Sequence, residues 1–345
     1  MGRKTGVLVL TAFLSGIGKI TLNDIAIPEP SKGELLIKVK TALTCGTDLK
    51  AYIRGYPLIP MPGPFGHEFS GVVEESIGVS AFKKGDEIMA VHTAPCLKCK
   101  YCKAGLYNLC KDIMDTKVIG AFSEYILLPA HIVKQNVFHK PKKVSFDEAA
   151  FLEPLSCVLH GMRGLDIKKG DRILIIGVGT IGLIHLLLLK QKRAIVAITD
   201  INKKRLKMAE SLGADFAFMP QMADTKTKAL TDGIGFDYIF ECTGRPEVWE
   251  SSISLLRCGG TLILFGGCPK GTKVSYDTER LHYDELTIKG VFHFMPEDVK
   301  KAYELICKGK LGLKRLISGR YPLKDIKKAF DRLKMGEGIK YAIIP

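Results

Sequence analysis

The sequence contains no long uninterrupted hydrophobic run, no internal repeat and no low-complexity segment. Its longest apolar stretch, Ile181 to Leu189, is broken by Gly182 and His185 and is far shorter than the roughly 20 residues that span a bilayer. Lysines occur in scattered pairs rather than in one basic stripe, and no recognised nucleic-acid motif accompanies them. We therefore expect no membrane span and no nucleic-acid partner, although the net charge is +15.

The chain also lacks clear signs of export. Its start has two basic residues and a short apolar run, but no small-residue cleavage site clearly follows. The segment Val7–Leu10 fits a first strand equally well, so we expect a cytoplasmic protein. With 345 residues, 46% of them hydrophobic, the chain is long enough for about two domains.

Two different patterns follow one another along the chain. Short strands separated by turn residues, such as Leu35–Lys40 and Asp86–Val91, fill roughly the first 150 residues. From about residue 156, continuous apolar strands such as Arg172–Ile176 alternate with helical stretches such as Ile181–Lys192 and Pro246–Arg257. The first pattern predicts a β-rich domain, and the second predicts a parallel sheet covered by helices on both faces.

Four cysteines lie close together in the sequence: Cys96, Cys99, Cys102 and Cys110. Four thiolates with such spacing are typical of a closed tetrahedral Zn²⁺ site, which is structural because no position is open for a substrate. Disulfides, an iron–sulfur site and unrelated core thiols are the alternatives. Disulfides would require export, and iron–sulfur runs often have a proline after the last cysteine, where this chain has Lys111. The spacing therefore favours structural zinc.

A glycine-rich turn directly follows the strand that ends at Ile176 and opens a helix; it reads Gly177, Val178, Gly179, Thr180, Ile181, Gly182. The first glycine permits a tight turn, the second lets the backbone approach a pyrophosphate, and the third lets helix and strand pack closely. The helix N-terminus offers unpaired N–H groups to the phosphates. This context predicts a dinucleotide site.

Asp200 ends the next predicted strand, 18 residues after Gly182. A carboxylate at this place binds the ribose hydroxyls and repels a 2′-phosphate, which favours NAD over NADP. Lys203, Lys204 and Arg205 lie just beyond and could accommodate a phosphate instead. We include Arg205 among the cofactor-binding residues.

Three further segments carry side chains that ligate metals: Cys45, the pair His67 and Glu68, and Glu153. A thiolate, an imidazole and a carboxylate leave a fourth position open for substrate, which is typical of catalytic zinc. Each also has an ordinary explanation, since Cys45 could be a small core residue and Glu153 could cap a helix. Spacing alone does not bring these residues together.

Taken in order, the motifs of the chain resemble those of the zinc-dependent medium-chain dehydrogenase/reductase family, in its sorbitol (L-iditol) and threonine dehydrogenase-like branch. The matching segments are CGTD at 45–48, GHE at 66–68, GDEIMA at 85–90, the four cysteines at 96–110, EPLSC at 153–157 and GVGTIG at 177–182. The resemblance implies an α/β fold with two domains and an active site in the cleft between them. A GroES-like β-rich catalytic domain would comprise 1–155 and 291–345, and a doubly wound Rossmann NAD-binding domain 156–290.

The resemblance also implies two zinc ions per chain. Cys45 and His67 match catalytic zinc ligands, and Glu68 and Glu153 match two acidic positions that share the remaining ligand duty. The four clustered cysteines match structural-zinc ligands. Of the cysteines outside these two sites (157, 242, 258, 268 and 307), all are expected to be buried, inert thiols.

The residues that would transfer the proton depart from the family pattern at one position. Thr47 matches the hydroxyl that takes the substrate proton, and Asp48 matches the carboxylate that orients His67. Three residues after Thr47, where many relatives have a histidine that passes the proton to solvent, this chain has Lys50. His92 is either a pocket residue or a structural histidine at a strand end.

The implied activity is hydride transfer from a secondary alcohol, first of all a polyol, to NAD⁺, with zinc activating the hydroxyl. L-Threonine and a sugar-alcohol phosphate are alternative substrates. A non-catalytic NAD-binding redox sensor is an alternative of a different class, although the full set of site residues argues against it. The resemblance further implies a homodimer or a homotetramer.

Overall fold

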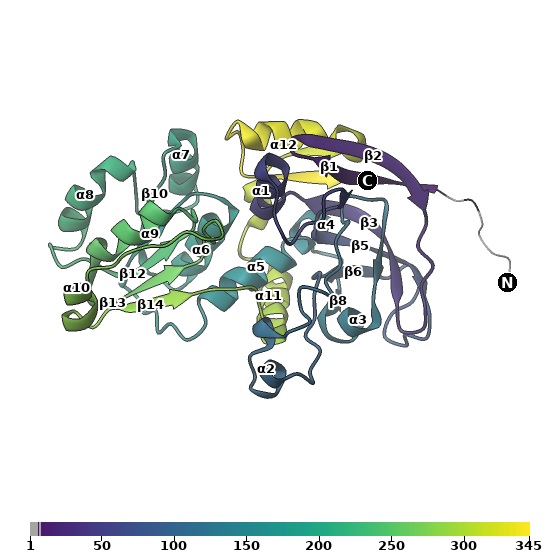
Figure 1. Ribbon diagram of the computed structural model, residues 1–345, viewed down its shortest axis with the longest axis horizontal. Coiled ribbons are helices and arrows are strands. Elements are labelled where there is room, and N and C mark those ends of the chain that lie inside the picture. Colours follow the sequence, from purple (N-terminus) through teal and green to yellow (C-terminus); the bar gives the residue numbers. More distant parts are fainter. Residues whose placement is uncertain (1–5, 7) are drawn as a thin grey trace. The chain divides into compact units, whose positions relative to one another are not determined.

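The computed structural model describes residue 6 and residues 8–345, which form two compact units (Figure 1). The first unit comprises the chain up to Leu159 together with Phe294–Pro345, and the second comprises His160–His293. Of the strand predicted at Val7–Leu10, Val7 lies outside the described residues, and the remainder begins the first strand. Within the described part of the chain, no helix is long and apolar enough to cross a membrane.

The first unit consists mainly of short strands. Its strands are β1 (Leu8–Gly16), β2 (Lys19–Ala26), β3 (Leu35–Leu43), β4 (Gly63–Pro64), β5 (Glu68–Ser76), β6 (Glu87–Ala90), β7 (Tyr125–Leu128), β8 (Val137–His139), β15 (Ile317–Pro322) and β16 (Lys340–Ile344). Its helices are α1 (Gly46–Arg54), α2 (Lys100–Lys103), α3 (Ala130–Asn136), α4 (Phe146–Ala149), α5 (Leu152–Gly161, which runs into the second unit), α11 (Pro296–Lys308) and α12 (Ile326–Lys334), with 3₁₀ turns at Tyr107–Leu109, Leu313–Leu316 and Leu323–Asp325.

These strands form a seven-stranded and a three-stranded sheet. The larger sheet has the order β15-β16-β3-β5-β6-β8, with β7 also paired to β3, and the smaller has the order β2-β1-β4. The alternation in β3, where exposed Lys38 and Lys40 flank buried Val39, is the pattern of a strand with one face on a core. Aromatic rings fill that core: the Phe65 ring lies 4.9 Å from Phe122 and 5.4 Å from Phe330. Segments far apart in sequence thus share one core.

The second unit alternates strands and helices. Its strands are β9 (Arg172–Ile176), β10 (Ile195–Thr199), β11 (Phe216–Phe218), β12 (Phe236–Glu241), β13 (Leu256–Leu264) and β14 (Thr287–Gly290). Its helices are α6 (Thr180–Gln191), α7 (Lys203–Ser211), α8 (Ala223–Leu230), α9 (Pro246–Ser252) and α10 (Thr278–Tyr283), with 3₁₀ turns at Pro220–Met222 and Ile253–Leu255.

All neighbouring strands of the second unit are parallel, in the order β11-β10-β9-β12-β13-β14. The strand order reverses between β9 and β12, which is the doubly wound arrangement, and ligands bind such sheets at the carboxyl ends of the strands beside that reversal. Figure 1 shows these parallel arrows with helices around them. The predicted α/β fold class is confirmed.

One predicted element is wrong at its end. The helix expected over Pro246–Arg257 stops at Ser252, and a 3₁₀ turn leads into β13 at Leu256. Leu256 pairs with Phe236 in the parallel ladder, and both side chains are buried. Pairing with the sheet therefore overrides the local helical pattern.

Candidate active site and metal centres

Cys45 lies at the junction between β3 and α1. It is the N-cap residue of α1, and its Sγ accepts a hydrogen bond from the Thr47 backbone N–H at 3.4 Å. Asp48, in the first turn of the same helix, is completely buried, whereas Thr47 is half-buried. The start of one helix therefore carries a thiol, a hydroxyl and a carboxylate.

His67 is placed by a tight turn immediately before β5. Gly66 has a φ of 90°, and a Cβ at this position would lie 2.6 Å from the Phe122 ring, so glycine is required here. The turn brings His67 Nδ1 to 3.3 Å from Asp48 Oδ1. Because Nδ1 faces a carboxylate, the second ring nitrogen is left for a metal.

Two buried carboxylates lie beside this imidazole: Glu68 opens β5, and Glu153 lies in the first turn of α5. His67, Glu68 and Glu153 each offer one ligand atom, and these three atoms lie within 4.8 Å of one another. Cys45, Asp48 and His67 form a second group within the same limit. His67 belongs to both groups, so the four residues expected at a catalytic zinc gather around one imidazole.

Sequence reasoning missed Lys340, which also reaches this site. Its Nζ donates hydrogen bonds to Glu68 Oε2 and, at 2.8 Å, to the Thr44 carbonyl oxygen. The side chains of Lys340 and Glu68 are each only 1% exposed. Strand β16 carries the lysine there because it pairs with β3. A lysine at the start of the apolar segment Tyr341–Ile344 is the one signal in the sequence.

Burial dominates the electrostatics of the site. It raises the pKa of Glu68 to about 7, opposed by the Lys340 ammonium and reinforced by repulsion from Glu153. Burial likewise raises the pKa values of Glu153 and of the Cys45 thiol. For His67, burial disfavours the charged ring, but the Asp48 carboxylate and the Cys45 thiol together hold the pKa well above its ordinary value.

The residues present fit a divalent cation. Among the described residues, the buried atoms Glu68 Oε1 and Asp48 Oδ2 have no hydrogen-bond partner. Buried carboxylate oxygens without partners are costly, and a cation bound close to them lowers that cost. A thiol, an imidazole and two carboxylates are the ligand types that Zn²⁺ takes in catalytic sites.

Two further side chains border Glu153. His92 Nδ1 lies 3.9 Å from Glu153 Oε1, and the His92 and His67 rings are 4.9 Å apart, so His92 faces the site. Cys157, one helical turn after Glu153, donates its S–H to Glu153 Oε1 at 3.5 Å. The expectation that the remaining cysteines are all buried is wrong. Cys258 is exposed because residues 257–260 bulge out of the β13 ladder, and the other four are half-buried: Cys157, Cys242, Cys268 and Cys307.

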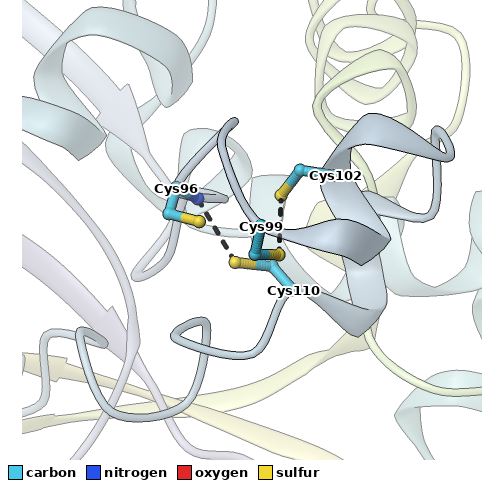
Figure 2. Close-up of side chains that lie close together, drawn as sticks. All are labelled: Cys96, Cys99, Cys102 and Cys110. Atoms are coloured by element: carbon cyan, nitrogen blue, oxygen red, sulfur yellow. Dashed lines mark hydrogen bonds between the residues drawn. The ribbon is translucent and has the colours of Figure 1, made fainter.

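The other four cysteines, Cys96, Cys99, Cys102 and Cys110, converge in the lobe around α2 (Figure 2). Their sulfur atoms lie within 4.8 Å of one another. The Cys99 and Cys102 sulfurs are 3.6 Å apart, and the Cys96 N–H donates to Cys110 Sγ at 3.3 Å. Four sulfur donors that converge in this way fit a closed zinc site.

The thiols of this lobe differ in acidity. Backbone N–H groups of Cys102 and Lys111 lower the pKa of Cys99 to about 6, whereas burial raises the pKa of Cys102 to about 12. The apolar cluster of the lobe consists of three of the cysteines and Ile113, with few half-buried neighbours. A core of this size gives little stability by itself, so the lobe depends on a shared metal.

The glycine turn of the second unit has the geometry of a dinucleotide loop. Gly177 has a φ of 104°, which favours glycine. A Cβ at Gly182 would lie 2.1 Å from the Gly177 carbonyl oxygen, so the third glycine permits close packing. A Cβ at Gly179 would meet nothing within 4 Å, which leaves open space before the N-terminus of α6, where Thr180 and Ile181 begin the helix.

Asp200 follows β10 and connects two turns. Its Oδ2 accepts the Val178 N–H of the glycine turn at 2.7 Å, and its Oδ1 accepts the Asn202 N–H at 2.7 Å. Asn202 in turn caps α7 by accepting the N–H groups of Lys204 and Arg205. The predicted ribose carboxylate and the basic residues beyond it therefore lie on one continuous segment next to the glycine turn.

Family comparisons agree with this geometry. Residues 31–141 match the alcohol dehydrogenase GroES-like domain, and residues 180–308 match the zinc-binding dehydrogenase domain.

Three curated relatives match nearly the whole chain. A sorbitol dehydrogenase of Halalkalibacterium halodurans is 32% identical over 338 residues, which are 96% of this chain and 97% of the relative. A D-arabitol-phosphate dehydrogenase of Enterococcus avium is 33% identical over 338 residues, covering 95% and 94%. An L-threonine 3-dehydrogenase of Coxiella burnetii is 33% identical over 322 residues, covering 90% and 91%.

Among solved structures, a zinc-binding dehydrogenase of Sinorhizobium meliloti bound to NADP has a TM-score of 0.89 at 30% sequence identity. The alignment covers 98% of this chain and all of that one. The chain belongs to the zinc-binding medium-chain dehydrogenase family. Within this family it is an NAD(P)-dependent alcohol or polyol dehydrogenase.

Proposed function

We propose that the protein oxidises a secondary alcohol, first of all a polyol, and transfers the hydride to NAD⁺. The observation that carries this proposal is the gathering of Cys45, Glu68 and Glu153 around His67 in the first unit. With an acidic ligand beside the thiol and the imidazole, this donor set resembles that of the polyol branch of the family. The glycine turn of the second unit supplies the matching dinucleotide site.

Cys45, His67 and one of the two glutamates would hold the catalytic zinc. Bound there, zinc supplies a Lewis acid that makes the substrate hydroxyl more acidic. Glu68 is already paired with the Lys340 ammonium. Glu153 has only weaker partners, the Cys157 thiol and the His92 ring. We therefore assign the direct ligand position to Glu153.

The chain's own residues orient the ligands and move the proton. Asp48 holds the His67 ring through Nδ1 and so fixes which nitrogen faces the metal. The resemblance to the family implies that the Thr47 hydroxyl accepts the substrate proton. Its position supports this role, since Thr47 is half-buried two residues from Cys45 and its N–H donates to the Cys45 sulfur. Lys50, three residues after Thr47 on the same helix, occupies the position at which many relatives have the histidine that passes the proton to solvent.

NAD⁺ is the preferred oxidant in this proposal. Asp200 places a carboxylate beside the glycine turn, where it repels a 2′-phosphate. NADP⁺ must be tested beside NAD⁺, because the related Sinorhizobium meliloti structure is bound to NADP and Arg205 lies close to Asp200 in this chain. Rates with both cofactors at equal concentration test the choice: a higher kcat/KM with NADP⁺ would overturn it.

The activity is tested with purified, zinc-loaded protein by following NADH absorbance. The substrates are sorbitol, xylitol, L-iditol, L-threonine, butane-2,3-diol and sugar-alcohol phosphates. The proposal expects the highest kcat/KM on an unphosphorylated polyol and loss of turnover in Cys45→Ser. Cys307→Ser, which changes a thiol on α11 outside the site, is the matched control and should keep activity.

Other outcomes would reassign the substrate. The highest kcat/KM on L-threonine or on a phosphorylated sugar alcohol would favour the activity of one of the other two relatives. NADH binding without turnover on any alcohol would favour a redox sensor. The predicted homodimer or homotetramer stays a prediction, which the mass of the protein in solution would test.

A further inference from the structure

Glu241 is a completely buried carboxylate in the second unit. It is the last residue of β12 and lies opposite Ile176, the last residue of β9, in the parallel ladder. Its position is therefore at the carboxyl edge of the sheet, beside the point where the strand order reverses. Burial raises the pKa of this carboxyl despite the hydrogen bonds that it accepts.

The hydrogen-bond partners of Glu241 are neutral donors on the turn that follows and on α9. Oε1 accepts the Thr243 N–H at 2.6 Å, the Thr243 hydroxyl, and the Gly244 N–H at 3.1 Å. Oε2 accepts the Trp249 indole N–H at 2.8 Å. That indole N–H also lies 3.1 Å from the Gly266 carbonyl oxygen. The carboxylate thus holds the turn after β12 and helix α9 directly, and the Trp249 indole links it to the turn after β13.

The backbone is tightly packed around this carboxylate. A Cβ at Gly266 would lie 2.2 Å from the Gly244 N and 2.9 Å from Glu241 Oε2. A Cβ at Gly244 would lie 2.5 Å from the Gly267 carbonyl oxygen. Glycines at these positions let the two turns touch, so the turn that Glu241 holds has little freedom to move.

This turn packs directly against the glycine loop. A Cβ at Gly177 would lie 2.9 Å from Thr243 Cγ2, and the Cys242 N–H donates to the Ile176 carbonyl oxygen at 2.9 Å. Thr243 is held by Glu241 at both its backbone N–H and its hydroxyl. The side of the loop formed by its first glycine is therefore shaped by a residue that Glu241 fixes.

We infer that Glu241 is a positioning residue of the dinucleotide site, which fixes Thr243 against Gly177 and so preorganises the loop that receives the pyrophosphate. This inference rests on the proposed binding of a dinucleotide at residues 177–182. Glu241 itself touches neither cofactor nor substrate in this role. It lowers the dissociation constant for the cofactor by removing loop freedom before binding.

Only an ionised carboxylate meets the whole set of donors. A glutamine of the same shape has one acceptor oxygen and one NH₂ group, so its NH₂ would face either the Thr243 N–H or the Trp249 indole N–H. Glu241→Gln therefore keeps the volume and breaks one half of the arrangement. Trp249 is the only tryptophan of the chain, so its fluorescence reports the change directly.

The experiment compares Glu241→Gln with Asp237→Asn. Asp237 lies on the same strand, four residues before Glu241 and toward the opposite edge of the sheet, where it accepts the Arg172 N–H at 2.7 Å and pairs with Arg257. Calorimetric titration gives the dissociation constant for NADH, and steady-state rates give KM for NAD⁺ and kcat. Circular dichroism gives the melting temperature of each variant.

We expect Glu241→Gln to weaken NADH binding and raise KM for NAD⁺ by about tenfold, which is what losing one hydrogen bond to a charged group predicts, with kcat little changed. Its tryptophan emission should shift. Asp237→Asn should lower the melting temperature without changing NADH binding. Thr243→Val, which keeps the shape and removes the hydroxyl, should weaken NADH binding by a smaller factor and serves if Glu241→Gln does not fold.

Three results overturn the inference in distinguishable ways. If wild-type protein binds NADH and Glu241→Gln binds it equally well, Glu241 only stabilises the fold and the proposed function stands. If Asp237→Asn weakens binding as much as Glu241→Gln does, the effect is general destabilisation. Failure of wild-type protein to bind NADH overturns the proposed function and this inference together.

Discussion

Lys340 donates a hydrogen bond to the carboxylate of Glu68, a residue 272 positions earlier in the chain, and both side chains are almost completely buried. The lysine reaches the candidate catalytic metal site from the last strand of the first unit. Its second donor contact, to the Thr44 carbonyl oxygen, ties the same ammonium to the segment that leads into Cys45. The end of the chain therefore takes part in the electrostatics of a site whose other residues come from its first half.

Replacing this lysine tests how the site balances its charge. Lys340→Met should lower the free energy of unfolding of metal-free protein by about 3–5 kcal/mol, because it leaves Glu68 buried without its cation. The free energy of unfolding of zinc-loaded protein should fall by less, since the metal replaces part of the missing positive charge. Urea unfolding of both forms measures the difference.

The double variant Lys340→Met/Glu68→Gln provides the control for this prediction. Removing both charges should restore much of the lost stability, because neither group is then left ionised and unpaired. A double variant as unstable as Lys340→Met would mean that packing of the lysine chain, including its approach to the Phe151 ring, matters more than its charge.

The glycines of the dinucleotide loop should respond differently to the same substitution. Gly179→Ala should fold normally and lose affinity for NADH, because the added methyl enters open space that the proposed pyrophosphate would occupy. Gly182→Ala should destabilise the second unit, because its methyl would lie 2.1 Å from a backbone oxygen. Melting temperatures and NADH titrations separate the two effects. Normal NADH affinity in Gly179→Ala would argue against the predicted binding mode.

The glycine loop is one of the elements that local signals in the sequence predict. Strand β9, the glycine turn and α6 were predictable because apolar runs, glycine spacing and helical periodicity are local signals. The four-cysteine lobe was predictable for the same reason, since its thiols lie within fifteen residues of one another. The fold class was predictable from the alternation of strands and helices along the chain.

Long-range relationships were not predictable from local signals. Nothing near Cys45, His67 or Glu153 in the sequence shows that they meet, and only the family resemblance suggested it. Lys340 carries no motif, and its role arises from the pairing of β16 with β3. The early end of α9 has the same origin, because Leu256 is drawn into the ladder opposite Phe236.

Loss of a single thiol from the cysteine lobe should release one zinc ion. Cys102→Ser should reduce the zinc content from two ions per chain to one and lower the melting temperature, because the lobe has almost no other core. Protease cleavage should then appear between residues 96 and 115. Elemental analysis and limited proteolysis measure both effects.

Cys258→Ser is the matched control for the zinc prediction. Cys258 is exposed on β13 in the other unit and contacts Asp284 at 3.4 Å. Its replacement should leave two zinc ions and the protease pattern unchanged. Full zinc content in Cys102→Ser would contradict four-thiolate ligation.

His185 should make the second unit sensitive to acid. This buried histidine of α6 has its ring 4.5 Å from Phe240 and 5.2 Å from Phe265, and its Nε2 has no hydrogen-bond partner among the described residues. Burial lowers its pKa from 6.5 to about 4. Between these values the unfolded chain binds a proton that the folded chain does not, so stability falls as the pH drops below 6.5.

His185→Leu should remove this contribution. The variant should be as stable as wild type or more stable at pH 7, and its advantage should grow to roughly 3 kcal/mol near pH 4, from 1.36 kcal/mol per pKa unit. Urea unfolding at several pH values measures how this stability difference changes with pH. Replacement of the exposed His282 by leucine is the control, because it removes a histidine that is not buried. A constant difference between His185→Leu and wild type at all pH values would show that the ring acts through packing, because only a proton taken up on unfolding produces a slope.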